Sequence, residues 1–169
     1  MLPDSPDVEK VVLGREGVHE GAGKDTIVID MSTVSPFTEI KIAEILKQKG
    51  VYYLDAPVTG STPDADVYKR QREAFDKSLP ILQCMGKNIH YMGNNGAGQF
   101  TKLCNQIAVS LNLLGTCEAL LLASKAGLDP LKVIEVLSSG AGSSWQLVNL
   151  GPKIVNKDFT PGFKAEHLR

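Results

Sequence analysis

The sequence predicts an α/β fold, in which a parallel sheet with covering helices is followed by a region that is entirely helical. Up to about residue 95, short runs of β-branched and aromatic residues alternate with amphipathic helical stretches, which is typical of βαβ units. The runs at 26–30 and 51–55 are largely apolar and end in aspartate, as expected of strands buried on both faces. After Gly96, no segment has the pattern of a strand.

The N-terminal part contains three predicted strands separated by helices. A first helix is expected over 7–13. Ser35 can cap the helix that follows the first strand, because Pro36 suits its first turn and Gly50 suits its end. The remaining predicted elements are a helix over 72–85 and a third strand over 89–92.

The C-terminal part begins with a long predicted helix over 99–126, which ends at Gly127. One stripe of this helix is apolar and consists of Phe100, Leu103, Ile107, Leu111 and Leu114. Two shorter helices follow, the first from Asp129-Pro130 to Leu137, the second from Ser143 or Ser144. The change of pattern predicts two domains, residues 1–96 and 97–169.

Charge and composition exclude several classes of protein. The 169 residues include 18 Lys and Arg against 19 Asp and Glu, so no basic cluster favours nucleic acid as a partner. The three cysteines are odd in number and lack metal-binding spacing, so we expect reduced core thiols and no metal site. The apolar region 107–128 contains polar and charged residues, which favours a buried helix of a soluble, cytoplasmic protein over a membrane span.

Two loops can carry chemistry, because ligands of parallel sheets bind at the carboxyl ends of the strands. The first loop covers 30–33 and the second covers 55–61. Backbone N–H groups and two hydroxyls, those of Thr59 and Ser61, could hold a substrate carboxylate in the second loop. An ordinary turn between a strand and a loop is the alternative.

Lys102 is the candidate catalytic residue. Asn105 and Gln106 follow it by three and four residues, which puts the three polar side chains on one helical face. A lysine can act as a general acid when burial lowers its pKa towards neutrality, and an amide can orient a substrate oxygen. The alternative is a solvated lysine followed by amides that serve only the local structure.

The chain resembles the β-hydroxyacid dehydrogenases, which include 3-hydroxyisobutyrate dehydrogenase and tartronate semialdehyde reductase (2-hydroxy-3-oxopropionate reductase). The matching segments, in the family's order, are MLPDSPDVEKVVLG, TIVIDMSTVSP, YYLDAPVTGS, MGKNIHYMGNNGAGQFTKLCNQ, EALLLASKAGLDP, GAGSSWQL and DFTPGFK. The resemblance implies a partial Rossmann-type NAD(P)-binding domain that leads through the long helix into an all-α domain. It also implies NAD or NADP as the cofactor.

The resemblance assigns roles to particular residues. Lys102 matches the family's catalytic lysine, which protonates the aldehyde oxygen as the nicotinamide delivers hydride. Matched positions on the substrate side are Thr59, Gly60, Ser61, Asn105, Gln106 and Trp145. Matched positions on the cofactor side are Leu2, Pro3, Thr33 and Phe163. For Trp145 and Phe163, a plain core position is the alternative.

Three departures from the family pattern predict a fragment that is truncated at both ends. The glycine-rich G-x-G-x-x-G turn that holds the cofactor's pyrophosphate is absent, so we expect weak cofactor binding. A charged segment at 66–71 replaces a glycine-rich strand of the family, which predicts a damaged sheet edge between Asp64 and Arg72. The Lys-Asp-Leu that follows the PGF segment in the family is also missing.

The preferred reaction is NAD(P)H-dependent reduction of a small 3-oxo acid, 2-hydroxy-3-oxopropanoate (tartronate semialdehyde), to glycerate. The spacing K-x-x-N-Q from Lys102 resembles the tartronate semialdehyde reductase branch. The alternatives are oxidation of 3-hydroxyisobutyrate, and an inactive fragment or non-catalytic scaffold with the same fold. We expect the intact parent to form a homo-oligomer, and Lys102 to face the loop 59–61.

Overall fold

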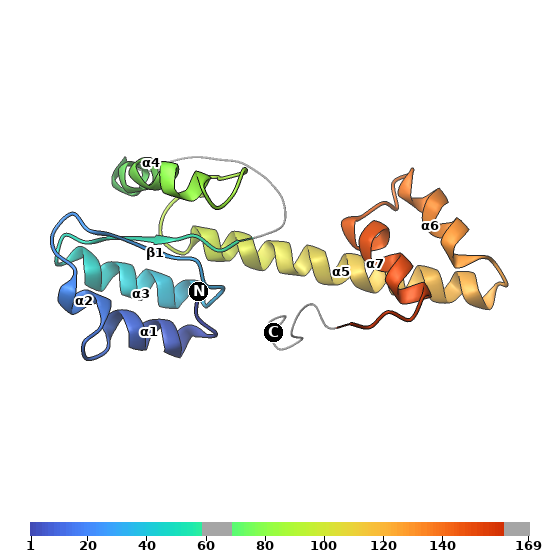
Figure 1. Ribbon diagram of the computed structural model, residues 1–169, viewed down its shortest axis with the longest axis horizontal. Coiled ribbons are helices and arrows are strands. Elements are labelled where there is room, and N and C mark those ends of the chain that lie inside the picture. Colours follow the sequence, from blue (N-terminus) through green and yellow to red (C-terminus); the bar gives the residue numbers. More distant parts are fainter. Residues whose placement is uncertain (59–68, 161–169) are drawn as a thin grey trace. The chain divides into compact units, whose positions relative to one another are not determined.

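The computed structural model describes residues 1–58 and 69–160, and of residues 69–71 the backbone alone (Figure 1). The chain divides into two compact units, Met1–Cys104 and Asn105–Arg169. The elements of the first unit are α1 (Ser5–Leu13), α2 (Val18–Gly21), β1 (Ile27–Asp30), α3 (Pro36–Lys47), β2 (Tyr52–Asp55) and α4 (Lys69–Gln83). The long helix α5 (Ala97–Lys125) begins in the first unit, and α6 (Pro130–Ser138) and α7 (Trp145–Val155) belong to the second.

β1 and β2 form a parallel pair whose register runs from Ile27 opposite Tyr52 to Asp30 opposite Asp55. The connection between them is α3, which gives one βαβ unit, as the alternation of patterns predicts. Both strands therefore end together, and their terminal aspartates are neighbours. Any ligand that binds at the carboxyl edge of this sheet meets the residues that follow these aspartates.

The core of the first unit is formed where α1 and α3 pack beside the two strands (Figure 1). Val8 of α1 and Ile42 and Leu46 of α3 have no exposed surface, and Tyr53 of β2 is 1% exposed. Burying side chains of this size stabilises the fold by about 1.5–3 kcal/mol each. The unit thus has its own apolar core.

The prediction of a third strand over 89–92 is wrong. In the described part of the chain the sheet consists of β1 and β2 alone, and residues 89–92 lie outside it. The apolar character of this run serves packing instead, because Tyr91 is buried with its ring centroid 5.3 Å from that of Phe75 in α4. An apolar run forms a strand only where a neighbouring strand offers it a ladder.

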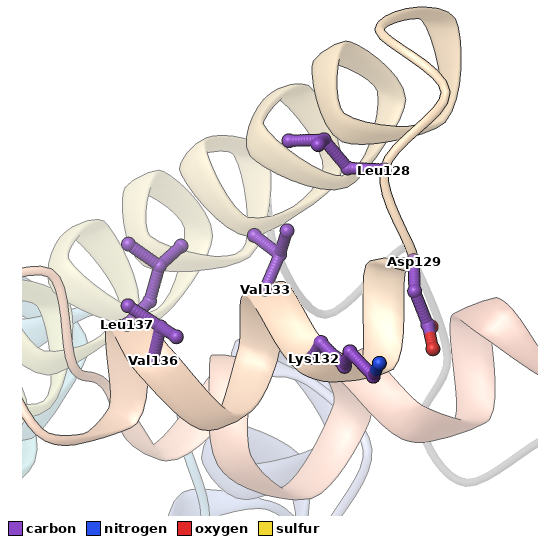
Figure 2. A pocket seen from close by; sticks show the side chains of 6 residues that line it. All are labelled: Leu128, Asp129, Lys132, Val133, Val136 and Leu137. Carbon is purple, nitrogen blue, oxygen red and sulfur yellow. The ribbon is translucent and has the colours of Figure 1, made fainter.

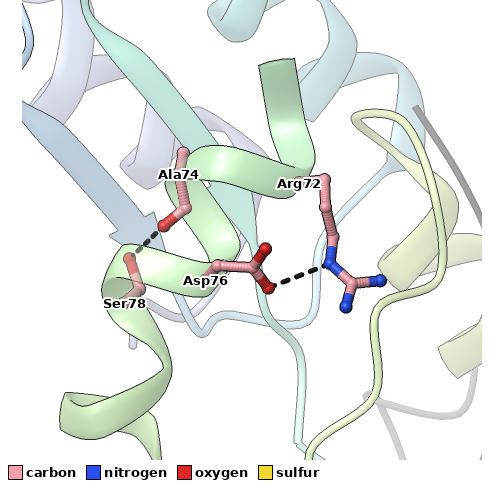
Figure 3. A network of polar contacts seen from close by, with 4 residues as sticks. All are labelled: Arg72, Ala74, Asp76 and Ser78. Carbon is pink, nitrogen blue, oxygen red and sulfur yellow. Dashed lines mark hydrogen bonds and ion pairs between the residues drawn. The ribbon is translucent and has the colours of Figure 1, made fainter. Parts of the chain in front are cut away.

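Contacts within α4 and to this run hold the helix in place. Ser78 Oγ donates to the Ala74 carbonyl oxygen at 2.8 Å, and Arg72 Nε lies 2.9 Å from Asp76 Oδ1, one turn away (Figure 3). The Arg72 guanidinium also lies over the Tyr91 ring, 5.5 Å from its centroid. The expected damage to the sheet at 64–72 lies mostly outside the described residues, and its last part is the first turn of α4.

The helix ends of the second unit follow the predicted caps. Gly127 ends α5 with φ +72°, a conformation that glycine adopts at no steric cost. The Asp129 side chain accepts from Leu131 N at the start of α6, and the Ser144 hydroxyl accepts from Leu147 N at the start of α7. Leu120, Ile134 and Leu147 form the buried core of this unit.

Two predictions about burial are wrong. The apolar stripe of α5 is exposed, with Ile107 and Leu111 each 62% and Leu114 57% accessible. The helices α6 and α7 pack on the C-terminal part of α5, where Leu120 is buried, and leave the stripe uncovered. In the described residues, α5 is the one helix long and apolar enough to cross a membrane by length and composition. The cysteines are free, as expected, but exposed rather than in the core: Cys84, Cys104 and Cys117.

Candidate active site

The carboxyl ends of the two strands adjoin the first turn of α5. The Asp55 side chain accepts hydrogen bonds from the backbone N–H of Gly96 (2.9 Å) and of Gln99 (3.1 Å). Burial raises the pKa of Asp55, and these N–H donors act in the opposite direction. A β-carbon added at Gly98 would lie 2.6 Å from the Asp55 carbonyl oxygen, so this approach requires glycine. The end of β2 therefore fixes where α5 begins.

Lys102 lies in the second turn of α5 and reaches the segment that follows β2. Its Nζ donates a hydrogen bond to the carbonyl oxygen of Val58 at 2.9 Å. Burial lowers the pKa of Lys102, the direction needed in a group that releases a proton near neutral pH. The ammonium group thus lies at the carboxyl edge of the sheet, where it is hydrogen-bonded to Val58, the residue before the loop 59–61.

The segment 32–34, which follows β1, is held from two sides. Gln99 Nε2 donates to the Ser32 carbonyl oxygen at 2.8 Å, and Gln99 Oε1 accepts from Val34 N at 3.2 Å. On the other side, Leu2 N donates to Ser32 Oγ at 2.8 Å. Ser32 and Val34 are buried, whereas Thr33 between them is exposed. This arrangement presents the Thr33 side chain to solvent from a fixed backbone.

A cluster of acidic groups is buried beside the strand ends. Glu39 of α3 has no exposed surface, and neither of its carboxyl oxygens makes a hydrogen bond of ordinary geometry. Burial, and after it the charge of Asp30, raises the pKa of Glu39 to about 8. The Tyr53 hydroxyl lies 3.4 Å from Asp30 Oδ2, and burial raises the pKa of Tyr53 as well. Glu39 therefore lies un-ionised near neutral pH.

The predicted site residues fall into three groups. Leu2, Pro3, Thr33 and Lys102 belong to the first unit, and Asn105, Gln106 and Trp145 to the second. In the second unit, Asn105 Nδ2 donates to Gln106 Oε1 at 3.1 Å, and Trp145 is 62% exposed, which does not fit a core position. Thr59, Gly60, Ser61 and Phe163 lie outside the described residues.

Sequence reasoning missed Glu39 and Gln99, which are buried polar residues of this region. The signal for Glu39 was present, because it precedes Ile42 by three residues and Leu46 by seven and so shares the core face of α3. Gln99 gave no comparable signal, because an amide at the start of a helix is common on protein surfaces. Only the structure shows both ends of its side chain bonded to the segment 32–34.

Two other features carry no catalytic chemistry. Among residues 1–58 and 69–160, no group of three or more His, Cys, Asp or Glu side chains could hold a metal ion. A depression of about 250 Å³ in the second unit is lined by Leu128, Asp129, Lys132, Val133, Val136 and Leu137 (Figure 2). It is largely apolar, and the Asp129 carboxylate already caps α6.

Two family models cover most of the chain. Residues 1–93 match the NAD binding domain of 6-phosphogluconate dehydrogenase, and residues 96–169 match the NAD-binding domain of NADP-dependent 3-hydroxyisobutyrate dehydrogenase. The first match spans more than half of the chain.

Curated relatives share this similarity along almost the whole chain. The uncharacterized oxidoreductase YkwC of Bacillus subtilis is 41% identical over 168 residues, 96% of this chain and 58% of the relative. The 2-hydroxy-3-oxopropionate reductase of Escherichia coli is 39% identical over 97% of this chain and 58% of its own. The 3-hydroxyisobutyrate dehydrogenase of Pseudomonas aeruginosa is 38% identical over 87% and 51%. The chain thus spans little more than half the length of these relatives.

A solved structure has the same fold. The 3-hydroxyisobutyrate dehydrogenase of Mycobacterium tuberculosis, solved with L-serine, matches with a TM-score of 0.83 and 26% identity over 99% of this chain and 61% of that chain. The βαβ unit, the long helix and the helical second unit are therefore those of this group of dehydrogenases. The chain belongs to the 3-hydroxyisobutyrate dehydrogenase and 6-phosphogluconate dehydrogenase family of NAD(P)-dependent oxidoreductases, which act on CH–OH groups.

Proposed function

We propose that this chain carries the catalytic lysine of an enzyme that reduces a small 3-oxo acid with NAD(P)H. The preferred reaction converts 2-hydroxy-3-oxopropanoate to glycerate. The observation that carries the proposal is the Lys102 ammonium, partly buried and bonded to Val58 O at the carboxyl edge of the sheet. The 39% identity to the Escherichia coli 2-hydroxy-3-oxopropionate reductase supports this choice of substrate.

The donors at this edge fit the nicotinamide end of a dinucleotide. Thr33 is exposed on a backbone held by Gln99 and Leu2, and it lies where ligands of parallel sheets bind. We assign Leu2, Pro3, Thr33 and Phe163 to this end of the cofactor. The connection between β1 and α3 contains no glycine, so it is not the turn that holds the pyrophosphate.

When bound, NAD(P)H supplies the hydride that reduces the aldehyde carbon. Lys102 Nζ holds the carbonyl oxygen by a hydrogen bond and gives it the proton that completes the alcohol. Because burial lowers the pKa of Lys102, the proton leaves more readily than from a solvated ammonium. From the resemblance, we assign Thr59, Gly60 and Ser61 to the substrate carboxylate, and Asn105, Gln106 and Trp145 to the recognition of the substrate.

The enzyme containing this chain acts in the cytoplasm on a soluble acid, and its intact form is a homo-oligomer. Nucleic acid and membrane are not its partners, because the charge of −1 is spread without a basic cluster. The second candidate reaction, oxidation of 3-hydroxyisobutyrate, is favoured by the 38% identity to the Pseudomonas aeruginosa enzyme. The ratio of kcat/KM for the two substrates decides between them.

The test uses a completed protein, in which the chain is joined to the upstream βαβ unit, the glycine-rich strand and the downstream Lys-Asp-Leu segment of the Escherichia coli relative. Lys102→Ala should lower kcat by about 10²–10⁴-fold, the range for one general acid. Lys102→Arg should restore little activity, because a guanidinium does not release its proton near neutral pH. Thr59→Val should mainly raise KM for the acid. Steady-state kinetics with NADH and NADPH measure all three.

Lys87→Ala, at an exposed lysine, is the matched control and should leave kcat unchanged. Turnover by Lys102→Ala at the original rate would show that the lysine is structural. The 169-residue chain alone, assayed in parallel, tests the alternative that the fragment is inactive while the completed protein is not.

A further inference from the structure

The carboxyl group of Glu39 is the least expected buried group of the first unit. It has 0% exposure and lacks a hydrogen bond of ordinary geometry at either oxygen. A buried carboxylate without such a partner would destabilise the fold by several kcal/mol, so the group is expected to keep its proton. The reaction proposed above makes no use of it.

The groups that act on Glu39 are acidic and come from both strands. They are Asp30 of β1 and Tyr53 and Asp55 of β2. The helix α1, which packs on α3, contributes the apolar side chains of Val8 and Val12 to this core. Glu39, Asp30 and Asp55 are three carboxyl groups that lie with the phenol of Tyr53 in one largely buried region. The four groups cannot all be charged at once, so the cluster carries fewer negative charges than it has acidic groups.

Hydrogen bonds connect Asp30 to the segment 32–34. Asp30 Oδ1 accepts from both Ser32 N (2.8 Å) and Ser32 Oγ (2.5 Å). Asp30 Oδ2 faces the Tyr53 hydroxyl at 3.4 Å. Ser32 is in turn bonded to Leu2 N and to Gln99 Nε2. A chain of polar contacts therefore leads from Tyr53 through Asp30 to the segment 32–34. Glu39 is buried beside the start of this chain and interacts electrostatically with Asp30.

We propose that Glu39 is a positioning residue: by keeping a proton beside Asp30 and Tyr53, it leaves Asp30 free to orient Ser32, and so fixes the surface formed by Leu2 and Thr33. Glu39 does not touch the cofactor or the substrate. The catalytic meaning of this role rests on the proposed function, because it depends on Leu2 and Thr33 meeting the nicotinamide end of the cofactor.

Deprotonation of Glu39 would place a second negative charge beside Asp30. The two carboxylates would repel each other, and Asp30 would move away from Ser32. This movement alters the acceptor that Ser32 uses to hold Leu2 N. The segment 32–34 should therefore respond to the protonation of a residue on another element, although Thr33 itself carries no titratable group.

The first experiment needs neither cofactor nor activity. Carbon-13 NMR of the glutamate carboxyl groups in the 169-residue chain, from pH 5 to pH 9.5, should show Glu39 titrating near pH 8, and the Leu2 and Thr33 amide signals should shift with the same midpoint. Glu39→Gln, which imitates the protonated form, should hold both amide signals at their low-pH positions. Glu44→Gln, an exposed glutamate of the same helix, is the control and should leave the titration unchanged.

Tyr53→Phe tests whether the response of Thr33 to the protonation of Glu39 passes through the Tyr53 hydroxyl. It keeps the ring in the core and removes the hydroxyl that faces Asp30, so the Thr33 amide should follow Glu39 less closely. The proposal is overturned if Glu39 titrates near its ordinary value, or if Thr33 does not respond while Glu39 titrates near pH 8. Circular dichroism of each variant shows whether the fold is kept.

The second experiment uses the completed protein. KM for NAD(P)H should rise about 3-fold to 10-fold as the pH passes 8, the size of one lost hydrogen bond, and Glu39→Gln should remove this rise. The kcat of Glu39→Gln should stay within about 2-fold of the unsubstituted protein, because Lys102 is unchanged. An inactive completed protein with the NMR coupling intact contradicts the proposed function alone, and an active one without the coupling contradicts only the role of Glu39.

Discussion

At the scale of single residues, Asp55 has the clearest structural task. It is the last residue of β2, and its two carboxyl oxygens accept from backbone N–H groups of Gly96 and Gln99 at the start of α5. These N–H groups belong to a helix start, where donors have no partner within the helix. One side chain thus joins the sheet to the helix that carries Lys102.

Asp55→Asn should lower the free energy of unfolding by about 1–3 kcal/mol, because the amide offers one acceptor and turns its NH₂ group towards a donor. Urea unfolding followed by circular dichroism measures the change. Asp25→Asn is the matched control, since Asp25 is exposed with φ +67°, a conformation that asparagine also adopts. Equal stability of Asp55→Asn and Asp25→Asn would show that the two hydrogen bonds contribute little.

Spacing and resemblance point to Lys102 as a catalytic residue, and this role stays a prediction; its hydrogen bond to Val58 O is visible only in the fold. The sequence did not predict the burial of Glu39, because a glutamate in the first turn of a helix usually faces solvent and interacts favourably with the helix dipole there. The position of a buried carboxyl group depends on the strands that α3 packs against. The loop 59–61 lies outside the described residues, so its role stays a prediction.

At the scale of elements, local signals predicted the helix ends of the second unit well, whereas Ser35 stands at the start of α3 without a side-chain capping hydrogen bond. Asp129, Ser144 and Gly127 act within one turn of the backbone they cap, so the sequence alone contains the needed information. The strand expected over 89–92 failed, because Tyr91 packs on α4 instead of joining a ladder. Periodicity does not distinguish an apolar run that packs from one that pairs.

The exposed stripe of α5 should make the chain associate with itself. Ile107, Leu111 and Leu114 are each more than half exposed and lie on one helical face, and a contiguous apolar patch of this kind promotes association. Replacing the three with glutamine should lower the apparent mass at high concentration, and helix content should remain, since glutamine has a good helix propensity. Sedimentation velocity over a range of concentrations measures the effect.

A control variant changes the same number of exposed apolar residues without a shared patch. Val11, Val18 and Ile81 lie on three different elements of the first unit and are 46%, 38% and 62% exposed. Their replacement by glutamine should leave the association unchanged. If both triple variants lower the apparent mass equally, self-association depends on the total exposed apolar surface and not on the α5 stripe.

At the scale of the whole molecule, resemblance predicted more than periodicity. The family models divide the chain between residues 93 and 96, and the compact units divide at Cys104 and Asn105, within α5. Motifs such as those that contain the strand-end aspartates occur in the same order as in the family, and this order identified the family from the sequence. Burial depends on everything that covers a surface, and the exposed α5 stripe shows that motif order does not predict it.

Stability of the chain should fall as the pH rises from about 5 to about 8. The pKa of Glu39 is about 8 in the folded chain and near 4.5 when exposed, so the folded state binds the extra proton in this range. Stability falls wherever the folded state binds more protons, by up to about 1.4 kcal/mol for each pH unit. Glu39→Gln should remove most of this slope and be the more stable protein at pH 8, as measured by urea unfolding at several pH values.

Asp55 is a second source of such a slope, because burial also raises its pKa. Glu44→Gln, which leaves both Glu39 and Asp55 unchanged, is the control and should keep the full slope. A slope that persists in Glu39→Gln would assign the proton uptake to another group.

The hydrogen bond from Leu2 N to Ser32 Oγ has a practical consequence for handling the protein. The second residue of the chain is anchored to the segment that presents Thr33, so any peptide attached through Met1 emerges beside that segment. A tag or label attached here would lie beside the surface that we assign to the cofactor. Cofactor binding is therefore best measured with the completed protein, in which the upstream βαβ unit is joined at this end.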